Sequence, residues 1–403
     1  MRPFRALRPE QGAAEKIASV PYDVVDTEEA KKLAQGNDLS FLHVIRPEID
    51  LPDGTDLYDD SVYEQAKINF DKLVSAGNLV LEEGPALYLY RLAAGGREQI
   101  GIAGCSSVDE YDNGTIKKHE YTRKAKEDDR VRHMLTLSAH AGPVLLTFRR
   151  TEKLHTLMQN EMERKPLFDF TAVDGVRHTI WRCSDSPAVE EAFKEVPALY
   201  IADGHHRAAG ASRVKQEMVR QGKPVTGSEE FNYFLTVSFP SDQLNIFAYN
   251  RYISDLGGKT EDQFLSEVKT VFTLSESGKT DPSQKGEICM YLGGAWHTLT
   301  EKGPGGETDP VSALDLSKFQ KKLLEPLLGI MDQRKDDRID FIGGEESSAK
   351  LQKRVDAHGG VAFTFYPVSV DELLAVADAE MVMPPKSTWF APKLRSGLLI
   401  HQF

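Results

Sequence analysis

The sequence predicts a mixed α+β fold, with sheets that contain hairpins and helices that flank them. Two apolar runs that alternate along the chain, residues 86–92 and 99–108, surround a short Gly-containing stretch, which is the pattern of a β-hairpin. Segments with helical periodicity follow one another or follow strands, without the regular strand–helix repeat of a doubly wound sheet. We therefore expect antiparallel and mixed pairing rather than one regular parallel sheet.

The length of 403 residues exceeds the usual size of one hydrophobic core, so two closely associated domains or one elaborate domain are expected. We divide the sequence into three regions. Residues 1–150 form an N-terminal α/β region that contains a His-Glu pair, residues 151–240 form a core that contains an Asp-Gly-His-His-Arg run, and residues 241–403 form a C-terminal α+β region. The tail of the third region is expected to return to the site that contains the Asp-Gly-His-His-Arg run.

The composition of the sequence limits the location and the classes of partner that we expect for the protein. The sequence is 40% hydrophobic and has no apolar run of about 18 residues, so we expect a cytoplasmic protein with no membrane segment and no cleaved signal. Three widely separated cysteines argue against a disulfide framework. A formal charge of −13 argues against nucleic-acid binding, so an anion site would have to be local, and an oligomer is possible.

The first segments combine short elements with one longer helix. A cap at Asp26 predicts a helix that runs to about Gln35, and residues 41–45 read as a short strand that extends to residue 48. Residues 62–76 predict an amphipathic helix. The residues available for burial on this helix are Ala66, Ile68, Phe70, Leu73 and Val74.

The remaining segments alternate less regularly. Residues 118–140 are charged and are expected to be mostly helical after Lys124, and residues 303–309 read as a surface loop. Strands are predicted at residues 143–148, 179–183, 198–202, 231–239, 287–292, 296–299 and 398–400, and helices at residues 187–193, 207–221, 261–271, 314–328 and 370–378.

Residues 203–207 carry the densest chemistry, because an apolar strand ends there in Asp203, Gly204, His205, His206 and Arg207 before a helix begins. The acid can take a metal or a hydroxyl proton, the glycine lets the backbone approach a ligand, and the guanidinium can hold phosphate oxygens. The free N–H groups of a helix N-terminus also favour an anion. The alternative is a capped helix whose Asp accepts backbone N–H bonds.

A second cluster follows residue 117. It contains His119, Glu120 and Thr122, and then Lys126 and Arg130 on one helix face. One interpretation makes Glu120 a base or metal ligand and the cations a phosphate clamp. The alternative is a solvated charged helix with ordinary ion pairs.

A third cluster lies in the tail, where Lys386, Ser387, Thr388, Lys393 and Arg395 follow two prolines and surround aromatic residues. Such a loop could order anionic oxygens. The alternative, a strap packed through its aromatic residues onto the body, explains the aromatics but leaves the cations unexplained.

Familiar catalytic motifs are missing from the sequence, including the phosphate-binding Gly-x-x-x-x-Gly-Lys loop, the dinucleotide fingerprint, the His-Glu-x-x-His helix and the Gly-x-Ser-x-Gly elbow. A metal shared by His205 and His206 is the weaker interpretation, because adjacent histidines on one turn point in different directions.

The three clusters, together with Pro-Tyr-Asp-Val-Val at residues 21–25, resemble the domain-of-unknown-function family numbered 1015 along the whole sequence. That family is linked to the ParB/sulfiredoxin-like fold, whose members bind nucleotide phosphates at a turn similar to residues 203–207 and include kinases of free serine. The resemblance implies a nucleotide site in a ParB/sulfiredoxin-like core. His205 stands where sulfiredoxin has its reactive cysteine, so sulfinic-acid repair is disfavoured.

The resemblance implies a kinase that uses ATP or ADP with Mg²⁺ to phosphorylate a small hydroxylated metabolite, with free serine as a candidate. Two alternatives are a noncatalytic nucleotide-binding regulatory protein and a phosphate-ester hydrolase. The expected catalytic residues are Glu120, Asp203 and His206, and the expected metal ligands are Asp203 and Glu120. The expected nucleotide and phosphate ligands are Gly204, His205, Arg207, His119, Thr122, Lys126, Arg130, Lys386, Ser387, Thr388, Lys393 and Arg395.

Overall fold

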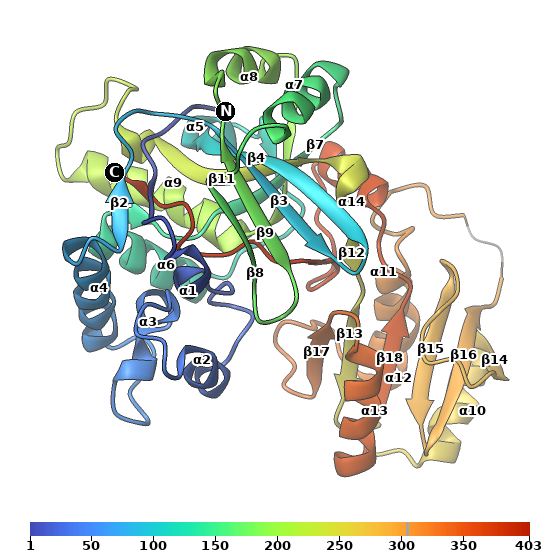
Figure 1. Cartoon of the computed structure of the whole chain (residues 1–403). Helices are drawn as coiled ribbons and strands as arrows, with labels where there is room; N and C mark the ends of the chain where they lie inside the picture. Colours follow the sequence, from blue (N-terminus) through green and yellow to red (C-terminus); the bar gives the residue numbers. More distant parts are fainter. Residues whose placement is uncertain (304–305) are drawn as a thin grey trace. The chain divides into compact units, whose positions relative to one another are not determined.

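A computed structural model describes residues 1–303 and 306–403 and divides them into two compact units. Unit 1 comprises Met1–Lys118, Thr122–Leu244 and Pro392–Phe403, and unit 2 comprises His119–Tyr121 and Asn245–Ala391. The end of the chain therefore belongs to the first unit. The prediction of a mixed α+β fold is confirmed, because both units combine helices with sheets (Figure 1).

Unit 1 is built on a mixed sheet with the strand order β5-β10-β7-β11-β4-β3-β9-β8. These strands are β5 (Ile116–Lys117), β10 (Leu199–Asp203), β7 (Val144–Phe148), β11 (Tyr233–Pro240), β4 (Arg97–Ser107), β3 (Tyr88–Ala94), β9 (Arg177–Arg182) and β8 (Phe168–Thr171). The pairs β10–β5 and β11–β7 are parallel, and the other neighbours are antiparallel. The predicted hairpin is present, since β3 and β4 pair up to Ala94 and Arg97 around Gly95 and Gly96, which both have positive φ.

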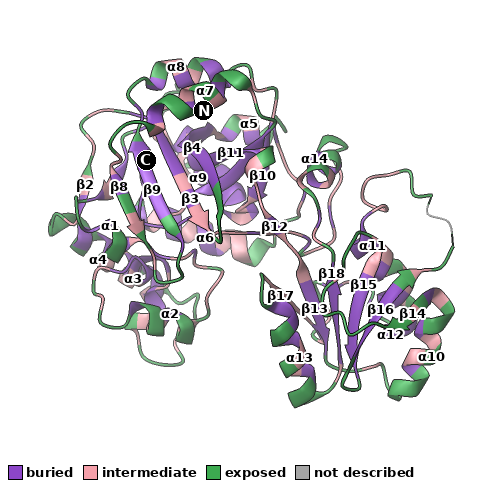
Figure 2. Cartoon of the chain, turned by 45° about the vertical axis from the view of Figure 1, so that its right-hand side comes forward, coloured by how far each residue is buried: buried purple, intermediate pink, exposed green. Residues whose placement is uncertain are grey.

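Helices and short strands complete unit 1, and their outward faces are exposed whereas the strands of the sheet are largely buried (Figure 2). The helices are α1 (Ala14–Ile17), α2 (Thr27–Ala34), α3 (Leu42–Ile45), η1 (Pro47–Asp50), α4 (Asp60–Ser75), α5 (Val108–Asp112), α6 (Lys124–Leu137), α7 (Glu152–Met162), α8 (Ser186–Phe193), α9 (His205–Arg220), η2 (Glu230–Asn232) and η3 (Ser241–Gln243). Two short pairs are β1 (Leu7–Pro9) with β2 (Leu79–Leu81), and β6 (Ala139–His140) with β20 (His401–Gln402). One buried cluster joins the sheet to α7, α8 and α9, and a second joins the N-terminal helices to α4.

Unit 2 contains a second sheet with the order β14-β16-β15-β18-β13-β17. Its strands are β13 (Tyr249–Ile253), β14 (Phe272–Glu276), β15 (Glu287–Leu292), β16 (Ala295–Glu301), β17 (Ile339–Gly343) and β18 (Val361–Phe365), with β12 (Ile246–Phe247) paired to β19 (Trp389–Phe390). Its helices are α10 (Glu261–Val271), α11 (Asp315–Phe319), η4 (Gln320–Leu324), α12 (Glu325–Leu328), α13 (Ser347–His358) and α14 (Val370–Asp378).

The predicted strand at residues 41–45 is wrong, because these residues form helix α3 and residues 47–50 form the 3₁₀ turn η1. Phe41, Leu42, Val44 and Ile45 are all buried in the N-terminal core cluster. A short run that is apolar on every side fits a buried helical turn as well as a buried strand, so its pattern does not distinguish the two.

Two further expectations need correction. On α4, Ile68 is 60% exposed and Val74 is also exposed, so the buried stripe is narrower than expected. Residues 398–400 form an isolated bridge at Ile400 rather than a strand. The predicted helix at residues 314–328 is present as α11, a π-helical turn and α12 without a gap, and Pro326 has no N–H to continue the α-helical hydrogen bonds. Within the predicted loop 303–309, residues 304–305 lie outside the described residues.

The cap of α2 provides a test of how local chemistry stabilises unit 1. The Asp26 carboxylate accepts from the Glu29 backbone N–H at 2.8 Å, and the Glu29 side chain accepts from the Asp26 N–H at 2.9 Å. We predict that Asp26→Ala lowers the free energy of unfolding by about 1 kcal/mol in urea titrations, because it removes this capping box. Asp26→Asn, which keeps the acceptor oxygen, is the control, and an equal loss in both variants would contradict the capping role.

Candidate functional site

The turn between β10 and α9 brings an acid, a glycine and the start of a long helix together. A bulge between Ile201 and Asp203 interrupts the pairing of β10 with β7 immediately before the turn, and bulges of this kind re-aim side chains next to functional sites. Gly204 then adopts φ +96°, and a Cβ there would lie 3.1 Å from the Arg207 guanidinium. A residue with a side chain would therefore be both strained and crowded at this position.

Helix α9 begins at His205 with no side-chain cap on its first turn. The capping residue is Gly204 in the left-handed conformation, so the alternative in which Asp203 caps the helix is not observed at this turn. The N-terminal end of a 16-residue helix thus follows directly after a carboxylate. Such an end attracts negative charge through its backbone N–H groups and its dipole.

The Asp203 carboxylate lies between two cations. Its Oδ2 atom is 3.4 Å from Lys393 Nζ and 3.5 Å from an Arg207 guanidinium nitrogen. Burial alone would raise the pKa of Asp203, but Lys393 and then Arg207 outweigh this effect and hold the pKa below its usual range. Asp203 is therefore ionised at neutral pH. The expected proximity of residues 203 and 393 is present within unit 1.

Arg207 points back into the protein. It is 7% exposed, and its Nη1 group donates to the Pro143 carbonyl oxygen. Its Nε atom is buried and makes no hydrogen bond among the described residues. Removing this buried group would take away the donor that the Arg207 guanidinium supplies to the Pro143 carbonyl oxygen, so Arg207 also contributes to the stability of the fold.

Helix α6 packs against α9 and carries Lys126 and Arg130 of the second cluster. Packing is close at Gly210, where a Cβ would lie 3.3 Å from Arg130 Cβ. The Arg123 backbone N–H donates to His206 Nε2 at 3.1 Å, so this ring nitrogen acts as an acceptor. Thr122 donates to Glu127 at the start of the helix.

The Arg130 side chain is buried, and it contacts other side chains of the fold. Its guanidinium donates to Asp129 at 2.6 and 2.9 Å, and lies 3.7 Å from the centre of the Tyr22 ring. Asp129 in turn accepts from Tyr63 at 2.8 Å. The segment 21–25 thus joins the second cluster through Tyr22. Lys126 differs, because its ammonium donates to the exposed Tyr58 hydroxyl at 3.2 Å.

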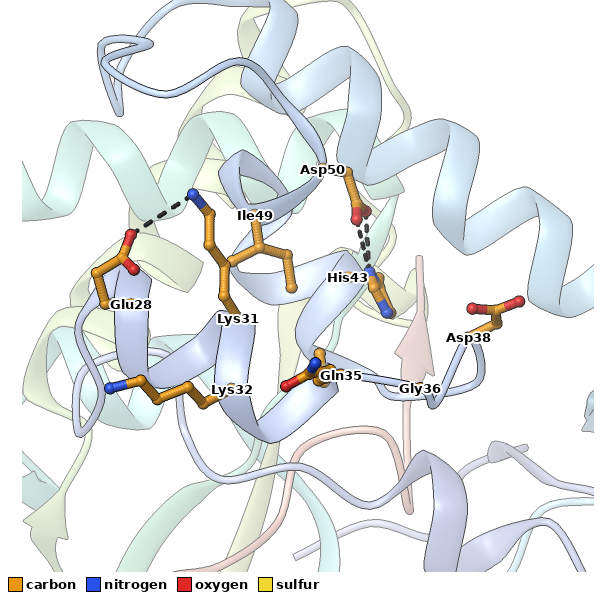
Figure 3. A pocket seen from close by; sticks show the side chains of 10 residues that line it. Glu28, Lys31, Lys32, Gln35, Gly36, Asp38, His43, Ile49 and Asp50 are labelled. Carbon is orange, nitrogen blue, oxygen red and sulfur yellow. Dashed lines mark hydrogen bonds and ion pairs between the residues drawn. The ribbon is translucent and has the colours of Figure 1, made fainter.

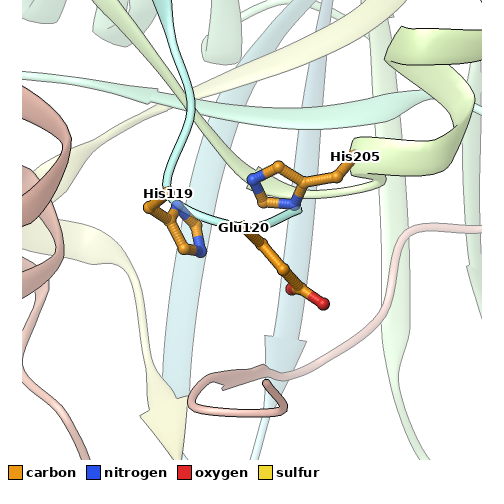
Figure 4. Close-up of side chains that lie close together, drawn as sticks. All are labelled: His119, Glu120 and His205. Atoms are coloured by element: carbon orange, nitrogen blue, oxygen red, sulfur yellow. The ribbon is translucent and has the colours of Figure 1, made fainter. Parts of the chain in front are cut away.

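His119, Glu120 and His205 could hold a metal ion. One ligand atom from each side chain lies within 4.8 Å of the others, and Figure 4 shows the three side chains together. The expected ligand pair was Asp203 and Glu120, so His119 and His205 are ligand candidates that the sequence interpretation assigned to phosphate binding.

The tail residues 386–388 belong to unit 2, and their role as phosphate ligands stays a prediction. Lys386 has φ +54°, and its Nζ is 3.4 Å from the Tyr249 hydroxyl. Buried Arg251 donates to the carbonyl oxygens of residues 385 and 386, and Ser387 donates to the carbonyl oxygen of residue 384. Trp389 lies against Gly343 of β17, where a Cβ would be 2.5 Å from the indole. The packed strap is therefore present up to Phe390.

A separate pocket of about 350 Å³ lies among α2, α3 and η1 (Figure 3). The His43 ring nitrogen Nδ1 bonds both Asp50 oxygens at 2.8 and 3.0 Å, and Asn69 bonds the same carboxylate at 2.7 Å. The Asp50 hydrogen bond raises the pKa of His43. Lys31 at the rim is paired with Glu28 and Asp53. None of the predicted site residues lines this pocket.

The chain belongs to the family described as protein of unknown function (DUF1015), whose model matches residues 1–317. The matched part includes the segment 21–25, the His119-Glu120 pair and the turn 203–207. The family model ends at residue 317, before the tail 384–397. The resemblance was expected along the whole sequence, and the model covers it up to that residue. No curated protein sequence matches the chain.

Several solved structures are similar to the chain. A mutant free serine kinase in complex with AMP is 14% identical, covers 73% of this chain and 92% of its own, and has a TM-score of 0.37. A conserved hypothetical protein from Pyrococcus furiosus is 15% identical, with coverages of 74% and 94% and a TM-score of 0.37. SbnI with a C-terminal truncation, from Staphylococcus aureus, is 12% identical, with coverages of 73% and 85% and a TM-score of 0.41. At such TM-scores and identities, the similarity carries no inference about function.

Every helix within residues 1–303 and 306–403 is too short or too polar to span a bilayer.

Lys393 is predicted to control the ionisation of Asp203. In the native protein the Asp203 carboxyl should stay ionised to the onset of acid unfolding, whereas Lys393→Met should raise its pKa. A carboxyl with a lowered folded-state pKa stabilises the fold above its unfolded pKa of about 3.9, and this contribution is lost as the pH falls through the folded value. The measurement is ¹³C NMR of aspartate carboxyl carbons, with Asp203→Asn to assign the signal.

The control for this prediction is Lys215→Met on α9. Lys215 is as buried as Lys393, with 14% and 15% of the side chain exposed, but it pairs with Asp109. It should leave the Asp203 signal unchanged. An unchanged Asp203 pKa in folded Lys393→Met would contradict the assignment.

Proposed function

We propose that this protein is a nucleotide-dependent phosphotransferase that transfers a phosphoryl group from ATP or ADP, with Mg²⁺, to the hydroxyl of a small metabolite, with free serine as a candidate acceptor. The observation that carries the proposal is the pairing of an ionised carboxylate with two cations at the uncapped start of α9. Phosphoryl transfer depends mainly on positioning and on charges that stabilise phosphate oxygens, and this turn supplies both.

The nucleotide phosphates would lie at the first turn of α9. Gly204 leaves the backbone accessible, and the helix N-terminus attracts the phosphate charge. Lys393 supplies a cation next to the turn, whereas Arg207 is held by Pro143 and orients the Asp203 carboxylate from behind. The resemblance of residues 203–207 to the phosphate-binding turn of ParB/sulfiredoxin-like proteins supports the same placement and the same core.

The low pKa of Asp203 separates its proposed role from that of Glu120. A general base works best when its pKa lies near the operating pH, so the low pKa of Asp203 makes it a poor base. Its ionised oxygens suit Mg²⁺, which prefers carboxylate oxygen, and the ion when bound would neutralise charge on the phosphates. Glu120 is then the proposed base. The acceptor oxygen bonds to the terminal phosphorus, the bond from phosphorus to the bridging oxygen breaks, and the hydroxyl proton passes to Glu120.

A noncatalytic nucleotide sensor and a phosphate-ester hydrolase would use the same charges. A sensor binds nucleotide without consuming it, and a hydrolase releases phosphate from esters without a nucleotide. Incubation with ATP or ADP, Mg²⁺ and a panel of hydroxylated metabolites, followed by ³¹P NMR, separates the three. The kinase consumes nucleotide only when an acceptor is present and forms a new phosphate ester.

We predict that Asp203→Asn lowers kcat/KM of this reaction at least about 100-fold, because the variant keeps the shape of the side chain and loses its charge. The matched control is Asp109→Asn, which neutralises an exposed carboxylate that pairs with Lys215 of the same helix α9. Full activity of folded Asp203→Asn, or an equal loss in both variants, would rule out the proposed role of the carboxylate.

A further inference from the structure

A buried polar network holds the segment that carries Lys393. Arg395 lies two residues beyond Lys393, and only 3% of its side chain is exposed. Its Nη2 group donates to Asp174, its Nε group donates to His178 Nε2 at 3.1 Å, and its backbone N–H donates to the Tyr90 hydroxyl at 3.3 Å. Three side chains from β3, β9 and the turn between β8 and β9 thus hold one arginine.

The protonation of this network follows from its geometry. A guanidinium only donates, so His178 Nε2 must carry a lone pair. In the neutral ring the proton is then on Nδ1, which lies 2.9 Å from the Tyr90 hydroxyl and donates to it. Burial, followed by the charge of Arg395, lowers the pKa of His178 to about 3, so the ring stays neutral at physiological pH. The His178 ring also stacks on the Phe170 ring, with 5.4 Å between the two ring centres.

The chain beyond Arg395 is equally fixed. Ser396 exchanges two backbone hydrogen bonds with Ser19, at 2.9 and 3.1 Å. Gly397 follows with φ +84°, and a Cβ there would lie 2.6 Å from Phe41. Lys393 therefore extends from a backbone that is anchored immediately after it.

Arg395 was expected to bind phosphate. Its guanidinium is instead occupied by Asp174 and His178, and among the described residues no hydrogen bond or ion pair joins it to Asp203, although Lys393 is paired with Asp203 at 3.4 Å. We propose that Arg395 is a positioning residue, which is anchored by Asp174, His178 and Tyr90 and thereby fixes Lys393 beside the Asp203 carboxylate. This inference rests on the proposed function for its catalytic consequence, since the lysine would act on the phosphates.

A double-mutant cycle tests the proposal through the Asp203 carboxyl signal in ¹³C NMR. Arg395→Gln should shift the pKa of Asp203 upward, in the same direction as Lys393→Met, because the lysine loses its fixed position. In the Lys393→Met background the same Arg395→Gln change should leave the Asp203 pKa where it is. Loss of stability alone would not produce this pattern.

Two more variants keep the test decisive if Arg395→Gln fails to fold. Asp174→Ala, which changes a half-exposed turn residue, should shift the Asp203 pKa in the same direction by a smaller amount, and Arg395→Lys should restore part of the native value. Asp169→Asn is the matched control, since Asp169 pairs with Arg177 on the same hairpin. Among the described residues, no hydrogen bond or ion pair joins Asp169 to residues 392–397. It should leave the signal unchanged.

Two outcomes overturn the proposal. One is an unchanged Asp203 pKa in the folded Arg395 and Asp174 variants, and the other is a shift that persists without Lys393, which would mean that Arg395 acts on Asp203 directly. In an active enzyme we expect Arg395→Gln to lower kcat about as much as Lys393→Met does. The expected pKa pattern without any phosphotransfer would refute the proposed function and leave the positioning role intact.

Discussion

The ionised Asp203 carboxylate is the constraint on which the arrangement of unit 1 depends. A carboxylate at the end of a largely buried strand is costly unless cations compensate its charge. One cation, Arg207, comes from the first turn of the helix that follows. The other, Lys393, comes from a segment 190 residues further along the chain. The local turn therefore cannot reach its electrostatic state without a distant part of the sequence.

The two cations differ in what they can do. Arg207 is buried and tied to a backbone carbonyl, so its planar group serves as a fixed wall behind the acid. Lys393 carries its ammonium on an unbranched stem from an anchored backbone, 3.4 Å from the Asp203 carboxylate, so the ammonium can turn from this oxygen to another anionic oxygen. A site with one fixed and one exchangeable cation can hold its shape while the charge in front of it changes. This property suits the binding and release of a phosphorylated ligand.

Much of this could be predicted from the sequence where the local signals agree. The cap at Asp26, the glycine-linked hairpin and the strand-to-helix turn at residues 203–207 were predicted because turn chemistry and apolar periodicity point to the same structure there. Residues 41–45 were predicted wrongly because a short apolar run has no period of its own. The occupied guanidinium of Arg395 could not be foreseen, since its partners Asp174 and His178 are more than 200 residues away and carry no motif. A charged residue that becomes buried must pair with another group, but the sequence does not show which group that is.

The interruption of unit 1 by unit 2 has a consequence for biosynthesis. Residues 245–391 lie between Thr122–Leu244 and Pro392–Phe403 of unit 1, so Lys393 is synthesised after all of them. Closing so long an insertion adds little entropy cost compared with a shorter one, because the cost grows only with the logarithm of length. During translation, however, the Asp203 turn is synthesised 190 residues before Lys393, so the nascent chain holds the carboxylate before this cation is available. The segment Pro392–Phe403 thus acts as a latch, because the Asp203 carboxylate can pair with Lys393 only after this segment has been synthesised and has packed into unit 1.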